Sequence, residues 1–275
     1  MEHKKKKLLT LPTLIWLLIF TVVPLVIMLV YSFQNGDGVF SLENYAKFFK
    51  KATYLKLTWR TIYTSLLVTV FSLIIAYPIA YALAKHIKKG KIVILALLII
   101  PFFTNQLVRV YSWLIFLQDG GILQTLLSSI GLISIDSSLG ILYTRAAVVI
   151  ALVHAYFPYM IVTIYMALER MDDSLLEASR VLGASSFTTF RRVVFPTSMP
   201  GVISGILIVF VPCLGSFVEP RILGGTNGTV IGTVVETQFK ELSVWNFGAA
   251  IAFILLLLVV ISMALINWWG RRYDT

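Results

Sequence analysis

Residues 172–196 read DDSLLEASRVLGASSFTTFRRVVFP and form a polar segment between two long apolar runs. The segment carries acids, arginines, serines and threonines, whereas the whole chain of 275 residues is 58% hydrophobic and only 13% charged. Charged side chains are costly to place in lipid, so this segment must lie in water. We therefore expect it to contact a partner protein, although an ordinary solvated loop would have a similar composition.

Two short amphipathic helices are predicted within this segment. Ser174 and Glu177 have the spacing of a capping box, in which the Ser oxygen accepts from first-turn amides and the Glu carboxylate accepts from the cap amide. Gly183 then supplies the left-handed residue that commonly ends a helix. Apolar residues over 187–194 repeat at helical spacing, and Pro196 should end or bend that second helix. The sequence therefore predicts a helix–glycine–helix knuckle.

The remainder of the chain has the composition of a membrane protein, because a soluble domain carries far more charge. Six apolar stretches are long enough to cross a bilayer. They lie at about residues 11–33, 61–84, 92–117, 146–168, 198–218 and 247–269. No linker or tandem repeat divides the chain. We therefore expect residues 1–275 to form a single all-α transmembrane domain, with residues 169–197 as one of its loops.

Positive residues predict which side of the membrane each loop occupies, because loops rich in Lys and Arg stay in the cytoplasm. Six spans place both termini and the polar segment on one side, which holds 14 of the 23 Lys and Arg residues. These are Lys4, Lys5, Lys6, Lys7, Lys85, Lys88, Lys89, Lys91, Arg170, Arg180, Arg191, Arg192, Arg271 and Arg272. That side is therefore predicted to be cytoplasmic. The external loop 34–59 opposes the rule with its lysines, and residues 41–49 within it resemble a short amphipathic helix.

The order of residues in the polar segment resembles the EAA loop of ABC-importer permeases. That pattern runs Glu-Ala-small, three residues, Gly, nine residues, and then aliphatic-x-apolar-Pro. The residues that carry it here are Glu177, Ala178, Ser179, Gly183, Val193, Phe195 and Pro196. Ser179, Val193 and Phe195 replace the usual Ala, Ile and Leu, and each keeps the size class or polarity. The resemblance implies the all-α fold of type I ABC-importer permeases, with a coupling helix that docks in a cleft of an ATPase subunit.

The chain shows no catalytic apparatus of its own. Gly90-Lys91 lacks the upstream glycine spacing and the following Ser or Thr of a phosphate-binding loop. The single Cys213 and three histidines indicate no disulfide framework or metal cluster. The excess positive charge lies at the ends of apolar runs, so it does not indicate nucleic-acid binding. We expect a transport subunit without enzyme activity or a cofactor, and a membrane-bound enzyme is the disfavoured alternative.

The resemblance also implies the partners of such a subunit. Two separate ATPase subunits would bind ATP and Mg. A second, homologous permease would supply the other half of the pathway, and an external substrate-binding protein would deliver cargo, all at the bacterial inner membrane. A secondary transporter or channel working alone is a rival, but it predicts inverted repeats or ion-coupling carboxylates within the spans, and the sequence shows neither.

Several stretches outside the polar segment are similar to the spermidine/putrescine branch of these permeases. They are GSFVEP at 215–220, LGG at 223–225, QF at 238–239, WNFGAA at 245–250, PFFTN at 101–105 and ENY at 43–45. The similarity extends from Leu42 to Ala250. It implies polyamines as cargo, although permeases for iron, thiamine, opines or inorganic anions share parts of the pattern and remain alternatives.

Polyamines carry ammonium groups separated by methylenes, so a pathway for them should offer carboxylates and aromatic faces. Glu219 ends an apolar run, where a carboxylate facing lipid would be costly, and is our main candidate. Trp113, Tyr156 and Tyr159 lie near or within spans, although interfacial anchoring or packing also explains such aromatics. Arg109 would repel a cation, so we expect it to have a structural or gating role.

Overall fold

The computed structural model describes residues 12–134 and 137–272, and every named element within them is a helix. The basic residues 4–7 and the expected start of the first span, Leu11, lie outside the described residues. Contacts divide the chain into two units, which we describe separately. Unit 1 comprises residues 1–56 and 234–257, and unit 2 comprises residues 57–233 and 258–275.

Five helical stretches in the described residues are long and apolar enough to cross a membrane: Pro12–Ser32, Ala52–Lys85, Arg145–Glu169, Ser186–Gly215 and Trp245–Gly270. They contain η1 (Leu18–Val22) with α2 (Val23–Ser32), α4 (Ala52–Lys85), α8 (Arg145–Glu169), the run of α10 (Ser186–Thr189), η3 (Phe190–Val194) and α11 (Phe195–Gly215), and α14 (Trp245–Gly270). Shorter helices are α3 (Glu43–Lys50), α7 (Ile122–Ser129), α9 (Ser174–Val181), α12 (Val218–Leu223) and α13 (Ile231–Lys240). The expected all-α class is confirmed.

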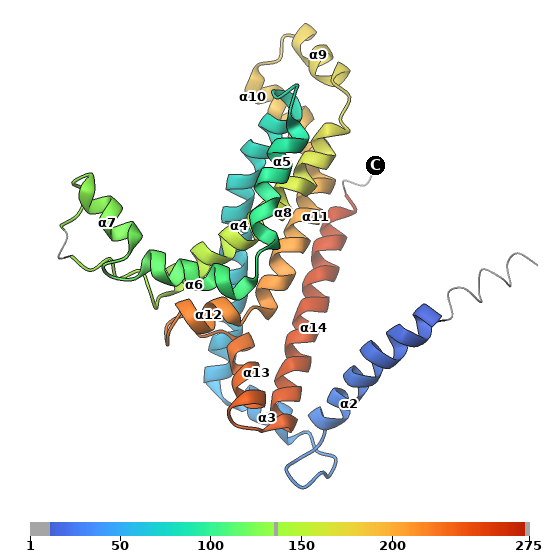
Figure 1. Cartoon of the computed structure of the whole chain (residues 1–275). Helices are drawn as coiled ribbons and strands as arrows, with labels where there is room; N and C mark the ends of the chain where they lie inside the picture. Colours follow the sequence, from blue (N-terminus) through green and yellow to red (C-terminus); the bar gives the residue numbers. More distant parts are fainter. Residues whose placement is uncertain (1–11, 135–136, 273–275) are drawn as a thin grey trace, which may run out of the picture. The chain divides into compact units, whose positions relative to one another are not determined.

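The expected span at 92–117 does not form one continuous helix. The chain instead forms α5 (Lys91–Ile99), the 3-10 turn η2 (Ile100–Phe103) and α6 (Gln106–Leu117). The turn contains Pro101, and a proline has no backbone N–H with which to continue a helix. Asn105 then starts α6, because its side-chain oxygen accepts from the N–H of Leu107 at 2.8 Å. The two helices run in clearly different directions (Figure 1).

Two prolines are accommodated by π-helical turns. The turns η1 and η3 each end two residues before a proline, at Pro24 and Pro196. In a regular helix, the proline ring clashes with the carbonyl four residues earlier, whereas a π-turn bonds five residues back and shifts that carbonyl. The helix therefore runs uninterrupted over Ser186–Gly215. Pro196 was expected to end or bend the helix, and the first of these alternatives is wrong.

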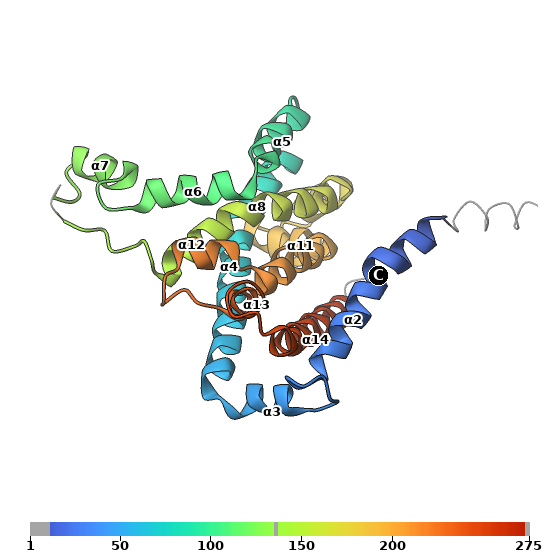
Figure 2. The same ribbon diagram turned by 60° about the horizontal axis from the view of Figure 1, so that its bottom comes forward.

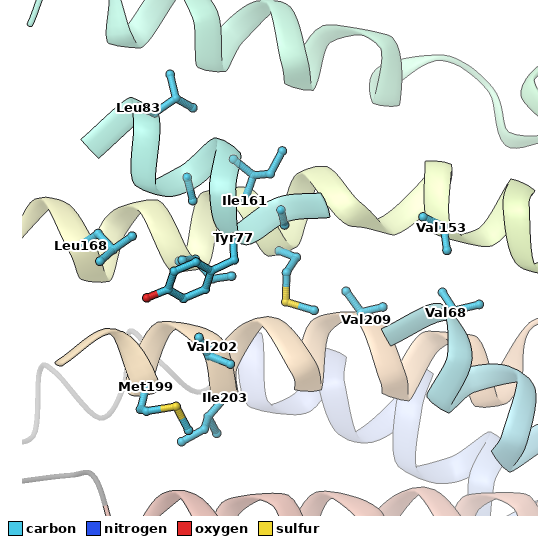
Figure 3. Close-up of a cluster of buried hydrophobic side chains, with 14 of the residues drawn as sticks. Val68, Tyr77, Leu83, Val153, Ile161, Leu168, Met199, Val202, Ile203 and Val209 are labelled. Carbon is cyan, nitrogen blue, oxygen red and sulfur yellow. The ribbon is translucent and has the colours of Figure 1, made fainter. Parts of the chain in front are cut away.

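The core of unit 2 lies between α4, α8 and α11. Figure 3 shows Val68 and Tyr77 of α4, Ile161 of α8 and Val202 of α11 among the buried side chains of this cluster. In Figure 2, α8 lies between α5 and α11. Packing between membrane helices depends on close van der Waals contact, which small residues permit. Gly201 serves this purpose, because a Cβ there would lie 2.6 Å from the carbonyl oxygen of Thr163.

Unit 1 is organised around aromatic contacts. The expected amphipathic helix within 41–49 is α3, whose Phe48 is buried and stacks on Tyr54 with ring centroids 5.6 Å apart. Tyr54 in turn makes an edge contact with Phe247 at 5.3 Å. The amide of Asn246 donates to the carbonyl of Asn35 at 2.5 Å. These contacts hold α3 and the preceding loop against the start of α14.

Replacing Gly201 by Ala is expected to destabilise unit 2. The added Cβ would meet the Thr163 carbonyl and the Cβ of Ala167, each at 2.6 Å, so α8 and α11 must separate. Overpacking of this kind costs about 1–3 kcal/mol. The expected result is a lower thermal unfolding midpoint of the purified protein in detergent.

The control for this experiment is Gly215→Ala, which makes the same change on the same helix. A Cβ at Gly215 meets nothing within 4 Å. Its unfolding midpoint should therefore equal that of the parent protein. If both variants unfold at the same temperature, close approach at Gly201 does not control the stability of this helix pair.

Candidate functional site

The polar segment begins with α9, which starts at Ser174. The carboxylate of Asp172 accepts from the backbone N–H of Ser174 at 2.9 Å. This hydrogen bond holds the pKa of the Asp172 carboxyl below its usual value. Asp173 occupies the N-cap position, but its own carboxylate bonds Lys85 instead of the helix amides. The expected capping box, with Ser174 as the cap, is therefore wrong, because Ser174 lies inside the helix.

Gly183 ends α9 as predicted, with φ at +72°. The N–H of Gly183 donates to the carbonyl of Arg180 at 2.9 Å, and the N–H of Ala184 donates to that of Ser179 at 3.1 Å. These two bonds form a Schellman motif, which needs a left-handed residue at the position of Gly183. A Cβ added there would meet nothing within 4 Å, so the requirement is conformational and not one of space.

The second helix of the knuckle begins at α10. The Ser185 side chain accepts from the N–H of Thr188 at 3.3 Å and caps the N-terminus of α10. The hydroxyls of Ser179 and Thr189 lie 2.7 Å apart and join α9 to α10. This bond gives a physical role to Ser179, one of the departures from the EAA pattern. Beyond it, Phe190 packs on Tyr77 of α4, with ring centroids 5.6 Å apart.

The knuckle exposes an apolar patch that we name the knuckle patch: Leu175, Val181, Leu182 and Phe187. Val181 is 88% exposed and Leu182 is 85% exposed. Exposed clusters of large apolar side chains mark interaction surfaces. Glu177 and Ala178 are exposed beside this patch on α9, and α9 buries no residue of its own. Sequence reasoning singled out the EAA residues but not the exposure of the patch.

The remaining EAA residues lie on the second helix of the knuckle. Val193 is half-buried, whereas Phe195 and Pro196 are exposed. Phe195 extends the aromatic contact, with its ring 5.8 Å from that of Tyr77. The structure therefore divides the EAA residues into two groups. Glu177, Ala178 and Gly183 form the outward-facing turn, and the others connect it to α4 and α11.

Glu219 lies at the other end of α11 from the knuckle, in α12 (Figure 1). Its residue is only 1% exposed. One carboxylate oxygen accepts from the amide of Gln106 at 3.0 Å, and the other accepts from the hydroxyl of Ser216 at 2.8 Å. Among the described residues, no Lys, Arg or His forms an ion pair with it. Glu219 is thus a buried carboxylate held by neutral donors.

The other residues expected near the pathway separate into two groups. Trp113 and Arg109 line a cavity of about 440 Å³ together with His154. The indole N–H of Trp113 donates to Nδ1 of His154 at 3.2 Å, and the Arg109 guanidinium lies over the Phe102 ring at 5.8 Å. Tyr156 and Tyr159 do not line this cavity. Tyr156 is half-buried and Tyr159 is exposed.

Comparison with known proteins identifies a family model and several permeases that are similar to this chain. The family model described as "Binding-protein-dependent transport system inner membrane component" matches residues 6–275. The chain is 37% identical over 263 residues to the "Spermidine/putrescine transport system permease protein PotB" of Escherichia coli (strain K12), covering 94% of each protein. The PotB of Salmonella typhimurium (strain SL1344) has the same identity, over 94% of this chain and 90% of its own length.

A solved structure supports the fold. The chain matches "Crystal structure of bacterial alginate ABC transporter in complex with alginate pentasaccharide-bound periplasmic protein" with a TM-score of 0.80 and 18% identity, covering 100% of this chain and 98% of that one. The expected fold of an ABC-importer permease is therefore confirmed. With the family model matched over nearly its full length, the chain belongs to the family of binding-protein-dependent transport system inner membrane components.

Proposed function

We propose that this chain forms half of the pathway of an ATP-driven importer that carries polyamines. Two ATPase subunits would bind ATP and Mg and dock on the knuckle. A second, homologous permease would complete the pathway, and an external binding protein would deliver the cargo. No bond of the cargo is made or broken by this chain. The proposed docking of the ATPase is supported by the exposed knuckle patch, which lies directly beside Glu177 and Ala178.

The proposed orientation places the knuckle and both termini in the cytoplasm. It is supported by the 14 Lys and Arg residues that six crossings would gather on that side. Five long spans lie among the described residues, so the segment from α5 through η2 to α6 would provide the remaining crossing, because α5 and η2 alone are too short. Within unit 2, the turn between α4 and α5 and the knuckle lie at the same end (Figure 1). This agrees with a shared cytoplasmic side for Lys85, Lys91 and the polar segment.

In the proposed mechanism, a displacement of the knuckle moves α11. The second helix continues without a break from Ser186 to Gly215, so a displacement of the knuckle would be conveyed into the bilayer along one continuous helix. ATP-driven closure of the ATPase subunits would displace α9 and thereby tilt α11. The pathway would then switch between inward-facing and outward-facing states, which the ligands of each state stabilise.

Polyamine cargo is supported by the chemistry around Glu219. A buried carboxylate without a cationic partner is costly in a medium of low polarity. An ammonium group of the cargo would supply that partner, with the Trp113, Tyr156 and Tyr159 rings as further contacts along the pathway. Arg109 would remain structural or gating. The likeness to PotB supports the same cargo.

An anionic solute is the second candidate. Arg109 lines the cavity beside Trp113 and His154, and the structure assigns it no carboxylate partner among the described residues. Such a cavity would suit a negatively charged group. Spermidine that fails to stimulate ATP hydrolysis by the assembled complex would remove the polyamine proposal and leave the importer proposal intact.

Replacing Leu182 by Asp is expected to weaken the contact with the ATPase. The side chain is 85% exposed, so a carboxylate there would not disturb the fold. Removal of a central apolar contact from an interface commonly costs about 2 kcal/mol, which is roughly a thirtyfold loss of affinity. The measurement is copurification of the ATPase with tagged permease, followed by a titration of the two purified components.

The matched control is Leu132→Asp, an exposed leucine that follows α7 in the same unit. This variant should copurify with the ATPase as the parent does. If Leu182→Asp and the parent bind the ATPase equally, the knuckle patch is not the docking surface.

Replacing Glu219 by Gln is expected to impair polyamine uptake. The change keeps the size of the side chain and a carbonyl oxygen for one hydrogen bond, but it removes the charge. A hydrogen bond to a charged group contributes about 1.5–3 kcal/mol, so the KM for spermidine should rise roughly tenfold to a hundredfold. Uptake into vesicles that contain the whole complex measures this.

Glu43→Gln is the control, because it makes the same change at an exposed carboxylate on α3. Uptake by this variant should match the parent. Unchanged KM in Glu219→Gln would show that the buried carboxylate has a structural role and no part in binding the cargo.

A further inference from the structure

Four helix ends meet beside residues 170–173, the segment that joins α8 to α9, which we name the neck of the knuckle. Lys85 is the last residue of α4, Lys91 the first of α5, Glu169 the last of α8, and Asp173 occupies the N-cap position of α9. The Lys85 ammonium bonds the Asp173 carboxylate at 2.5 Å, and the Lys91 ammonium bonds both carboxylate oxygens of Glu169 at 2.9 Å. Figure 1 shows the ends of α4, α5 and α8 close to α9. The α4–α5 turn is thus fastened to both sides of the neck at residues 170–173.

The pair of Lys91 and Glu169 occupies positions that the helices themselves disfavour. A positive charge at a helix N-terminus and a negative charge at a C-terminus both oppose the helix dipole. Each charge is compensated by the other, and the Glu169 carboxylate raises the pKa of the Lys91 ammonium above its ordinary value. Lys91 also donates to the carbonyl of Ala84 at 3.1 Å, which closes the α4–α5 turn.

Lys85 is bound by two acceptors. Its side chain is only 7% exposed. Besides the Asp173 carboxylate, its ammonium bonds the carbonyl of Met171 at 3.0 Å. A buried ammonium that loses its acceptors is strongly destabilised, so this contact resists separation. The positive charge at the end of α4 is also favoured by the dipole of that helix.

α9 has few other attachments to the body of unit 2. It buries no residue, but Leu176 is half-buried against the core cluster of unit 2, and the helix packs against α10 and η3. On its C-terminal side, the hydroxyl contact of Ser179 with Thr189 joins it to the second helix. On its N-terminal side, the neck is joined to α4 and α5 by the two lysines, and the Met171 side chain is buried in the core cluster of unit 2. A displacement of α9 therefore acts on α11 through one side and on the α4–α5 turn through the other.

We propose that Lys85 and Lys91 convey the movement of the knuckle to α4 and α5, as a second route beside the continuous helix that enters α11. The two lysines are positioning residues, because they touch neither nucleotide nor cargo. This inference rests on the proposed docking of an ATPase on α9. It assigns a role to two members of the basic cluster 85–91 beyond setting the orientation in the membrane.

The experiment follows α5 and α11 separately in the purified complex with its ATPase, reconstituted in nanodiscs. In a Cys213→Ala background, an environment-sensitive fluorophore is attached to Ile92→Cys on α5 or to Thr197→Cys on α11. Both positions are exposed. A non-hydrolysable ATP analogue is then added, and the change in fluorescence is recorded. This readout does not depend on the identity of the cargo.

The variants test the ion pair by exchange of its charges. Lys91→Glu and Glu169→Lys should each reduce the response of α5 severalfold while the response of α11 is retained. The double variant should restore the response of α5, because the exchanged charges attract each other and also agree with the helix dipoles. Lys85→Met should reduce the response of α5 in the same way.

Lys89→Glu is the control, since Lys89 is an exposed lysine in the same turn. It should leave both responses unchanged. Equal responses of α5 in the parent and in all variants would overturn the inference, as would a loss that the double variant fails to restore. No nucleotide response at α11 in the parent complex would instead contradict the proposed docking of the ATPase.

Discussion

The continuity of the helix from Ser186 to Gly215 is the constraint on which this structure depends. The polar segment and the apolar stretch that follows it share one helix, yet the boundary between them carries Pro196. The π-turn η3 resolves this conflict by shifting the carbonyl that the proline would meet. The same helix then continues from the knuckle to the close contact of α11 with α8 at Gly201. The left-handed Gly183 ends α9 and allows the chain to turn before this continuous helix begins.

The side chains of Lys85 and Glu219 in unit 2 have different kinds of hydrogen-bond partner. Lys85 has a carboxylate and a carbonyl as acceptors, so its charge is compensated within the chain. Glu219 has only the neutral donors of Gln106 and Ser216 among the described residues. The contacts of Lys85 supply acceptors from within the chain, which favours a structural role for this lysine. The contacts of Glu219 leave its carboxylate without a cationic partner among the described residues, which is the observation behind the proposed contact with a cationic cargo.

Features that depend on residues close together in the sequence were predicted correctly. The helical class, the amphipathic helix within 41–49 and the left-handed Gly183 follow from apolar periodicity and from the conformational freedom of glycine. The break within 92–117 is not predicted, because this stretch is long and apolar enough to cross a membrane. In the structure, Pro101 and Asn105 divide it into α5, η2 and α6. The cap of α9 was misassigned for a different reason. The carboxylate of Asp173 is bound by Lys85, 88 residues away, and no local pattern shows such a contact.

Charges at helix ends nevertheless carry information on these distant contacts. A lysine that begins a helix or a glutamate that ends one opposes the helix dipole, so each position implies a partner of opposite charge. Lys91 and Glu169 are such a pair, 78 residues apart in sequence. Apolar periodicity identifies the helices of a membrane protein but says little about which ends adjoin, because lipid and neighbouring helices are equally apolar. In this chain, the disfavoured charges beside the short polar connections indicate how the helix ends are joined.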